Sequence, residues 1–194
     1  KSGDPYVLPH LLSFSNEEER KTFVDALQFV TNRHDVLRTC VIGTGLPYAV
    51  QVVLREVPLT VEHLTIDNPE NVLSELESLM APGCQWLDVS KAPLLELKSA
   101  DDSLNNNYYL IVNQHHLVMD HVGLEKIIFE VDQYLSGNED MLTKPVLYPE
   151  FIGHTLHLQA TNDSESYFKN LLTDIEEPTY PFELSNIRGN GSDI

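Results

Sequence analysis

The sequence has little cysteine, few basic residues and no long apolar run, and each shortage excludes a class of protein. Its 194 residues include two cysteines, Cys40 and Cys84, without CxxC spacing, which excludes a disulfide framework. We expect both thiols to be reduced and buried, which suits a cytoplasmic protein. No apolar run approaches the roughly 20 residues that a membrane span needs. The first residues, KSGDPYVLPH, lack the order of a signal peptide.

Acidic side chains outnumber basic ones in this sequence. Twelve Lys and Arg residues face 30 Asp and Glu residues, which gives a formal net charge of −18. Such a surface repels nucleic acids and anionic membranes. A glycine-rich phosphate loop is also lacking, because Gly43 and Gly45 lie between two strand-like segments and precede no helix. The sequence therefore predicts no nucleic-acid, membrane or nucleotide partner.

Strand-like and helix-like segments alternate along the chain. We predict strands near residues 6–14 (an irregular or edge strand around Pro9), 36–42, 48–54, 93–100 and 108–114, and the second and third of these form a hairpin. We predict helices over 15–33, from Asn68-Pro69 to about residue 81, after Asp120 to about 135, and over 165–172. This alternation predicts an α/β (α+β) two-layer sandwich with helices packed on a mixed sheet. Residues 186–194 are predicted to be a flexible tail.

Two details of the first helix are also predicted. Ser15 and Glu18 have the spacing of a capping box, so we expect the helix to begin after Ser15. Arg33, near its end, is expected to be solvated or close to the negative end of the helix dipole.

The segment NQHHLVMDHVGLE, residues 113–125, concentrates polar groups within an apolar run. Val112 to His116 continues the alternation of a strand, so His115 and His116 are predicted to point to opposite faces. They stand at a strand end beside a helix N-terminus, where α/β sheets often present functional groups. Asp120 has three possible uses: capping the helix, orienting an imidazole, or pairing with an arginine, for which Arg38 is preferred.

Three interpretations of this histidine cluster follow from the residues alone. A neutral imidazole accepts a proton near pH 7, so one histidine suits acid–base chemistry. His115, His116, Asp120 and His121 are also metal-ligand types. However, ligands four residues apart need a helix, and His116 precedes the predicted helix start, so we predict no metal site. Ordinary structural histidines beside a helix cap remain the third interpretation.

Six motifs resemble one family. His115 to Asp120, HHLVMD, matches the HHxxxD core of the HHxxxDG signature of condensation domains in nonribosomal peptide synthetases, which belong to the chloramphenicol acetyltransferase-like superfamily. RHDVLRT (33–39) resembles the RHxxLRT motif of these domains, VQVV (50–53) their QVV strand, and WLDVSKAPLL (86–95) their FDLxxxPLL stretch. YPEF (148–151) and SYFKNLL (166–172) are similar to the YxDF and YWxxxL motifs.

The resemblance implies a chloramphenicol acetyltransferase-like lobe, with residues 1–185 as the N-terminal lobe of a condensation domain. The family's first motif and the motifs of its C-terminal lobe find no counterpart here, so we expect a lobe from a larger synthetase that is inactive alone. The chain also departs from the motif at His121, which replaces the glycine after the aspartate.

The resemblance also implies a reaction and its residues. An acyl or peptidyl thioester on an upstream peptidyl carrier domain is attacked by the amine of an aminoacyl thioester on a downstream carrier, and an amide forms. His116 takes the family's catalytic position, where it positions or deprotonates the amine or stabilises the tetrahedral intermediate. His115, Asp120 and Arg38 are implied as structural support, and His121 and Gly123 as candidates for the tunnel wall.

No cofactor or metal is expected in the domain itself, because the phosphopantetheine belongs to the carriers. The implied partners are the two carrier domains and the C-terminal lobe. Self-association is expected if the face toward that lobe is exposed. Two other functions stay open: a non-catalytic module for carrier docking or gating, in which His121 marks lost activity, and a related acyltransferase that uses acyl-CoA.

Overall fold

The computed structural model of the chain describes residues 3–177, and the predicted tail 186–194 lies outside the described residues. The chain divides into two compact units, Lys1–Glu150 and Phe151–Ile194. The first unit contains the sheet and the histidine cluster.

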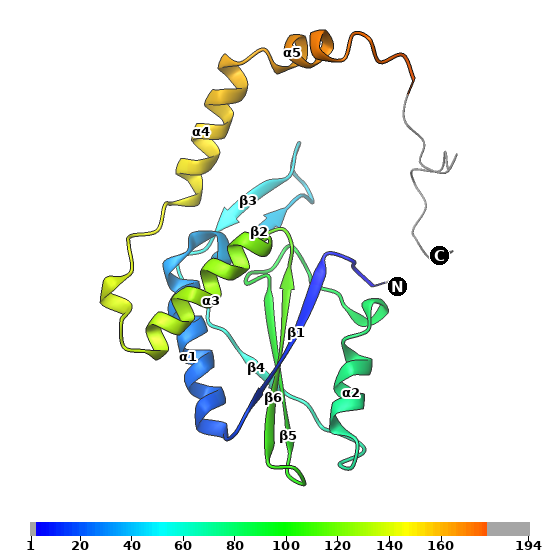
Figure 1. Cartoon of the computed structure of the whole chain (residues 1–194), viewed down its shortest axis with the longest axis vertical. Helices are drawn as coiled ribbons and strands as arrows, with labels where there is room; N and C mark the ends of the chain where they lie inside the picture. The colour runs from blue at the N-terminus through cyan, green and yellow to red at the C-terminus, as the bar shows by residue number, and fades with distance from the viewer. Residues whose placement is uncertain (1–2, 178–194) are drawn as a thin grey trace. The chain divides into compact units, whose positions relative to one another are not determined.

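A four-stranded mixed sheet forms the middle of the first unit (Figure 1). Its strands lie in the order β1 (Val7–Phe14), β6 (Asn107–His115), β5 (Leu95–Asp102) and β4 (Val61–His63). β4 runs parallel to β5, and the other neighbours are antiparallel. β1 lies at one edge, as predicted from its proline.

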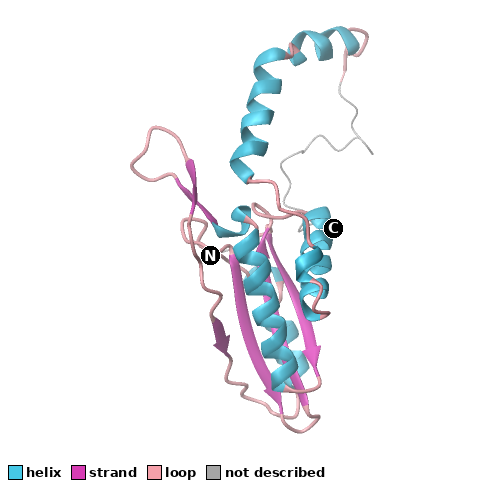
Figure 2. Ribbon diagram, turned by 90° about the vertical axis from the view of Figure 1, so that its left-hand side faces the viewer, coloured by secondary structure: helices cyan, strands magenta, loops and turns pink. Residues whose placement is uncertain are grey.

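The predicted hairpin is also present. β2 (Thr39–Ile42) and β3 (Val50–Val53) pair antiparallel as a separate two-stranded sheet, which Figure 2 shows apart from the larger one. A short 3₁₀ helix, η1 (Asp35–Arg38), occupies the residues before β2 that were expected to be strand.

Helices cover both faces of the four-stranded sheet. α1 (Glu17–Arg33) and α3 (His121–Leu135) pack on one face, and the shorter α2 (Val72–Leu79) packs on the other (Figure 1). Because side chains alternate along a strand, Leu110 joins the core under α1 and α3, whereas Ile111 joins the core under α2. The predicted α/β arrangement, with helices packed on a mixed sheet, is confirmed.

Other elements are short or were not predicted. η2 (Pro82–Cys84) and η3 (Glu139–Met141) are single 3₁₀ turns, and α5 (Ser164–Leu171) agrees with the prediction within one residue. α4 (Tyr148–Thr161) was missed because its apolar residues form no continuous stripe, and all its residues are at least partly exposed. β4 was missed because it has only three residues, all of them exposed.

The start of α1 differs from its prediction by one residue. Asn16, with an extended backbone, is the N-cap, and its Oδ1 accepts the Glu19 N–H at 2.8 Å. Glu19 Oε2 accepts the Ser15 N–H at 3.1 Å in return. The capping box therefore uses Asn16 and Glu19, because the pair one residue further along has the same spacing. α2 similarly begins after its N-cap Asn71, so Asn68-Pro69 forms a turn before it.

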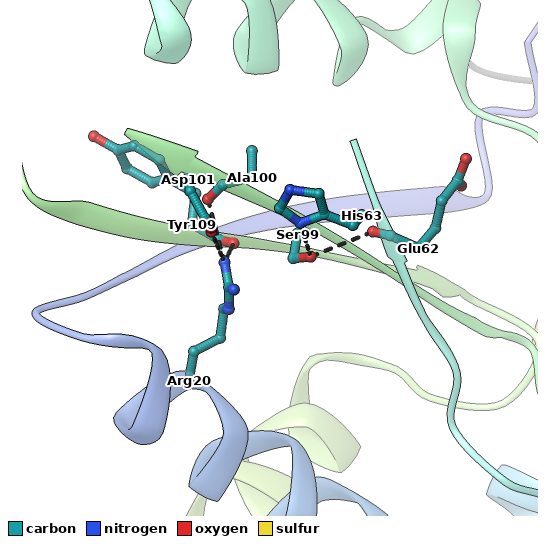
Figure 3. Close-up of polar contacts among 7 residues, drawn as sticks. All are labelled: Arg20, Glu62, His63, Ser99, Ala100, Asp101 and Tyr109. Atoms are coloured by element: carbon teal, nitrogen blue, oxygen red, sulfur yellow. Dashed lines mark hydrogen bonds and ion pairs between the residues drawn. The ribbon is translucent and has the colours of Figure 1, made fainter. Parts of the chain in front are cut away.

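Arg20 ties α1 to the sheet. Its guanidinium Nη1 donates to Asp101 Oδ1 at 2.6 Å and to the carbonyls of Ala100 and Tyr109, both at 3.3 Å, as Figure 3 shows. On the neighbouring strand pair, His63 Nδ1 lies 3.2 Å from Ser99 Oγ in the same view. These contacts fix the ends of β5 and β6 that are remote from the histidine cluster.

A buried carboxylate joins α1 to α3. Glu130 is 1% exposed, and its Oε2 lies 2.9 Å from both Arg33 Nε and His34 Nε2, while Lys126 Nζ is 3.4 Å from Oε1. Burial raises the pKa of Glu130, but the hydrogen bonds and charges of Arg33 and His34 outweigh it and hold the pKa below its ordinary value. Arg33 also donates to the Thr143 carbonyl at 2.8 Å. Of the two alternatives predicted for Arg33, solvation is wrong, because a buried carboxylate needs a cationic partner. The other holds, because Arg33 lies in the last turn of α1.

Two further expectations can be compared with residues 3–177. Cys40 is buried as expected, whereas Cys84 is exposed in the turn η2. Within this part of the chain, no helix has the length and apolar content needed to cross a bilayer.

We predict that Glu130→Gln destabilises the fold by roughly 3 kcal/mol at pH 7, because it leaves Arg33 without its carboxylate. A loss of that size lowers the Tm of a chain this long by about 6–12 °C in thermal denaturation. The folded-state pKa of Glu130 is depressed, so its contribution is fully present above the ordinary value of 4.5 and is lost as the pH falls through the lower folded value. The difference in Tm between wild type and variant should therefore narrow in acid.

Glu125→Gln is the matched control, since Glu125 is exposed on the same helix, and it should leave the Tm unchanged. Equal Tm values for Glu130→Gln and wild type at pH 7 would contradict a stabilising network.

Candidate functional site

The histidine cluster begins at the last residue of the central strand. His115 is 4% exposed and its backbone N–H donates to the Leu94 carbonyl at 3.0 Å. Its ring Nδ1 accepts the Leu117 N–H at 3.1 Å, and its Nε2 lies 3.3 Å from Asp4 Oδ2. Because a backbone N–H can only donate, Nδ1 is unprotonated and Nε2 carries the proton toward Asp4. The imidazole of His115 is therefore held on both nitrogens.

His116 differs from His115 both in its exposure and in the ring nitrogen that carries the proton. The residue is exposed in the turn that follows β6, and its backbone N–H donates to the Tyr6 carbonyl at 2.8 Å. Its ring Nδ1 lies 2.8 Å from the Met119 carbonyl oxygen. A carbonyl can only accept, so Nδ1 carries the proton and the neutral ring keeps its lone pair on Nε2. The ring lies in a shallow depression lined by Tyr6, His115, His116 and Leu117. His116 thus offers an oriented acceptor nitrogen at the surface.

Asp120 is the N-cap of α3. Its Oδ1 accepts the Gly123 N–H at 2.8 Å, and this bond, with smaller contributions from the charges of His121 and His116, holds the pKa of Asp120 below its ordinary value. Of the three uses that the sequence left open, the helix cap is the one for which the described residues supply a hydrogen bond to Asp120.

Gly123 permits this cap. A Cβ added at Gly123 would lie 3.1 Å from Met119 Cγ and 3.3 Å from Asp120 Oδ1, which is closer than ordinary van der Waals contact. The glycine therefore lets the first turn of α3 approach its capping carboxylate. His121, which replaces the glycine of the family motif, is exposed as the first residue of α3.

Arg38 does not pair with Asp120 in the described residues, so that expectation is corrected. Its Nη1 donates to the backbone carbonyls of Leu54 and Arg55, the latter at 2.9 Å. The Leu54 N–H in turn donates to the Arg38 carbonyl at 2.9 Å. These bonds close the end of the β2–β3 hairpin. Backbone carbonyls replace the carboxylate that was expected for this arginine, because the chain after β3 returns beside η1.

An apolar cavity of about 240 Å³ lies between the sheet and helices α1 and α3. Met119, whose carbonyl holds His116, contributes to its wall, together with His10, Gln114 and Leu124. Burial lowers the pKa of His10, so this imidazole is neutral at pH 7, and its buried Nε2 has no hydrogen-bond partner in the described structure. An apolar group can thus be accommodated behind the turn that carries His116.

Within residues 3–177, no group of three or more His, Cys, Asp or Glu side chains is arranged to hold a metal ion. The same residues reveal two polar partners that the sequence did not indicate. Asp4 is separated from His115 by more than a hundred residues in the sequence. Glu130 is one of many acidic residues in the predicted helices, and the sequence does not distinguish it from the others. The only available signal for Glu130 is its place on the apolar side of α3, between Ile127 and Val131.

Known proteins resemble the chain over nearly its whole length. The family model named Condensation domain matches residues 1–180. Malpibaldin synthetase from Mortierella alpina is 34% identical over 193 residues, which are 99% of this chain and 4% of that protein. Malpinin synthetase from the same organism is 31% identical over 195 residues, which cover 100% of this chain and 2% of that protein. The chain therefore spans a small part of the length of these relatives.

A solved structure gives the same fold at low identity. The condensation domain of the monacolin K polyketide synthase MokA superposes with a TM-score of 0.67 at 16% identity, over 91% of this chain and 39% of that one. Together with the family match over residues 1–180, this chloramphenicol acetyltransferase-like fold confirms the resemblance noted in the motifs: the chain belongs to the condensation-domain family of nonribosomal peptide synthetases.

Proposed function

We propose that His116 is the catalytic residue for amide-bond formation between two carrier-bound thioesters. The observation that supports this most directly is the hydrogen bond from His116 Nδ1 to the Met119 carbonyl, which leaves the lone pair of Nε2 free to accept, on a residue that is exposed. A nitrogen in this state accepts a hydrogen bond or a proton, and it is held in one orientation before the substrate arrives.

The proposed reaction joins two partners. A donor acyl or peptidyl thioester arrives on an upstream peptidyl carrier domain, and the amine of an aminoacyl thioester arrives on a downstream carrier. The amine nitrogen attacks the donor carbonyl carbon, the C–S bond breaks, and the donor's phosphopantetheine leaves as a thiol. His116 Nε2 aligns the amine by accepting its hydrogen bond and takes up the proton that the nitrogen loses.

In this proposal the domain requires no cofactor of its own, because the phosphopantetheine arms belong to the carriers. The chain supplies the acceptor nitrogen, the turn that holds it, and the capped helix that supports the turn.

We propose further that the reaction takes place in a larger domain. The MokA condensation domain is more than twice as long as the portion that this chain matches. α3 also carries large apolar side chains that are more than half exposed, Val122, Ile128 and Phe129. Side chains of this kind usually meet another part of a domain or another protein. They support a contact with the C-terminal lobe in the whole domain and self-association of the chain when it is alone.

We predict that His116→Ala, made in the intact condensation domain, reduces amide formation by at least about 100-fold, because general-base groups contribute that much or more. Product yield between two loaded carriers is the measurement, and the Tm should stay unchanged because His116 is exposed. His154→Ala, at an exposed histidine of α4, should leave the yield as in wild type. An unaltered yield for His116→Ala would favour a non-catalytic docking or gating module.

A second variant separates the structural role of Asp120 from a chemical one. Asp120→Ala removes the N-cap of α3 and should lower the Tm by a few degrees. Asp120→Asn keeps an oxygen that can accept the Gly123 N–H, so its Tm should stay close to that of wild type. Full stability of Asp120→Ala with loss of amide formation would show that the carboxylate takes part in the chemistry instead.

A separate prediction concerns the activity of the 194-residue chain alone. Supplied with both loaded carriers, it should give no amide above the uncatalysed background, because His116 then faces open water. Amide formation by the chain alone at the rate of the intact domain would contradict the need for a larger domain.

A further inference from the structure

Both the backbone and the side chain of Asp4 are held by polar contacts beside His115. Its backbone N–H donates to the Gln85 carbonyl at 2.7 Å, and its own carbonyl accepts the Val7 N–H at 3.1 Å. Its side chain is 23% exposed, and each of its two carboxylate oxygens has a polar contact. Oδ1 accepts the Tyr6 N–H at 2.9 Å, and Oδ2 lies 3.3 Å from His115 Nε2. The carboxylate is therefore held in place before it contacts the histidine.

One route leads from Asp4 to His116 through the first histidine. Asp4 Oδ2 lies 3.3 Å from His115 Nε2, and its charge favours the proton on that nitrogen, which leaves Nδ1 of the ring free to accept the Leu117 N–H at 3.1 Å. Leu117 is the residue after His116, so this bond fixes the chain on the C-terminal side of His116. If His115 took the other tautomer, its Nδ1–H would face the Leu117 N–H and the turn would lose this bond.

A second route runs through the backbone. Oδ1 of Asp4 accepts the Tyr6 N–H, and the Tyr6 carbonyl accepts the His116 N–H at 2.8 Å. The chain on the N-terminal side of His116 is thus held by a residue that Asp4 also holds. The His116 N–H and the Leu117 N–H are each bonded to a residue, Tyr6 and His115 respectively, that contacts the Asp4 carboxylate.

We propose that Asp4 is a positioning residue for His116: through His115 and Tyr6, it fixes the turn in which His116 Nδ1 meets the Met119 carbonyl. This inference rests on the catalytic role proposed for His116. Asp4 does not touch the reacting atoms in this scheme. It keeps the lone pair of His116 Nε2 directed outward by holding the backbone on either side.

A carboxylate suits this position better than an amide. Asp4 accepts on both oxygens, whereas an asparagine offers one acceptor oxygen and an NH₂ group that cannot accept. Asp4→Asn therefore loses either the Tyr6 bond or the His115 bond, with little change in size. Asp4→Glu restores both acceptors on a side chain that is one methylene longer.

The first test measures which ring nitrogen of each imidazole carries the proton. In the 194-residue chain labelled with ¹⁵N-histidine, the ring nitrogen shifts report the tautomers of His115 and His116. We expect the Nε2–H form at His115 and the Nδ1–H form at His116 in wild type, and a mixture at both residues in Asp4→Asn. Asp163→Asn is the matched control, because Asp163 Oδ1 accepts the Ser166 N–H at 3.0 Å at the start of α5 in the other unit, and it should leave both tautomers unchanged. Unchanged tautomers in Asp4→Asn would overturn the proposal.

The second test uses the intact condensation domain with both loaded carriers. Asp4→Asn should lower kcat about tenfold, the effect of losing one charge-assisted hydrogen bond, with little change in KM for either carrier, and Asp4→Glu should recover part of that loss. A fall in kcat without a tautomer change, or an equal loss in Asp4→Glu and Asp4→Asn, would overturn the positioning role. If His116→Ala keeps full activity, the proposed function fails, whereas the tautomer result still reports whether Asp4 orders the turn.

Discussion

The central strand β6 is hydrogen-bonded on both sides, and its register determines which of its residues face each core and where the histidine cluster lies. It pairs with β1 from Val7 opposite His115 and with β5 from Leu95 opposite Gln114. Both of its faces are covered by a core. A slip of one residue would exchange Leu110 with Ile111 between these cores and turn His115 away from Asp4. The register that buries the apolar side chains therefore also buries the first histidine and leaves the second at the turn.

The buried Glu130 adds a constraint of a different kind. Leucine pairs between α1 and α3 would stabilise the contact at least as well as a buried ion pair does, because the charges lose their hydration. Their geometry is more demanding, however. The observed placement of α3 brings the Glu130 carboxylate to Arg33 and His34 together. Since the cap residue Asp120 begins the same helix, this network also sets the position of the turn that carries His116.

Local patterns in the sequence account for much of this structure. Alternation and helical spacing predicted the hairpin, the α/β layers and the opposite faces of His115 and His116, and they gave the helix cap as one of three uses of Asp120. The failures at Arg33, Arg38 and Asp4 concern choices that depend on distant contacts. Which of Arg33 and Arg38 meets a carboxylate depends on Glu130 in α3, roughly a hundred residues later in the chain. Asp4 shows the same limit, because nothing near it in the sequence indicates the histidine it contacts. α4 escaped prediction for a local reason, the absence of a regular apolar stripe.

The group that orients the imidazole of His116 is a backbone carbonyl and not a carboxylate. In a Ser-His-Asp triad a carboxylate holds the imidazole and stabilises its charged form. Here a neutral carbonyl, that of Met119, orients His116, and the carboxylates nearby are engaged elsewhere: Asp120 with the Gly123 N–H, Asp4 with His115 and Tyr6. This arrangement fixes the direction of the Nε2 lone pair. A thioester is already activated toward amines, so aligning the amine and removing one proton demand less of the imidazole than generating an alkoxide would. A carbonyl-oriented histidine is therefore compatible with the role that we propose for His116 in amide formation.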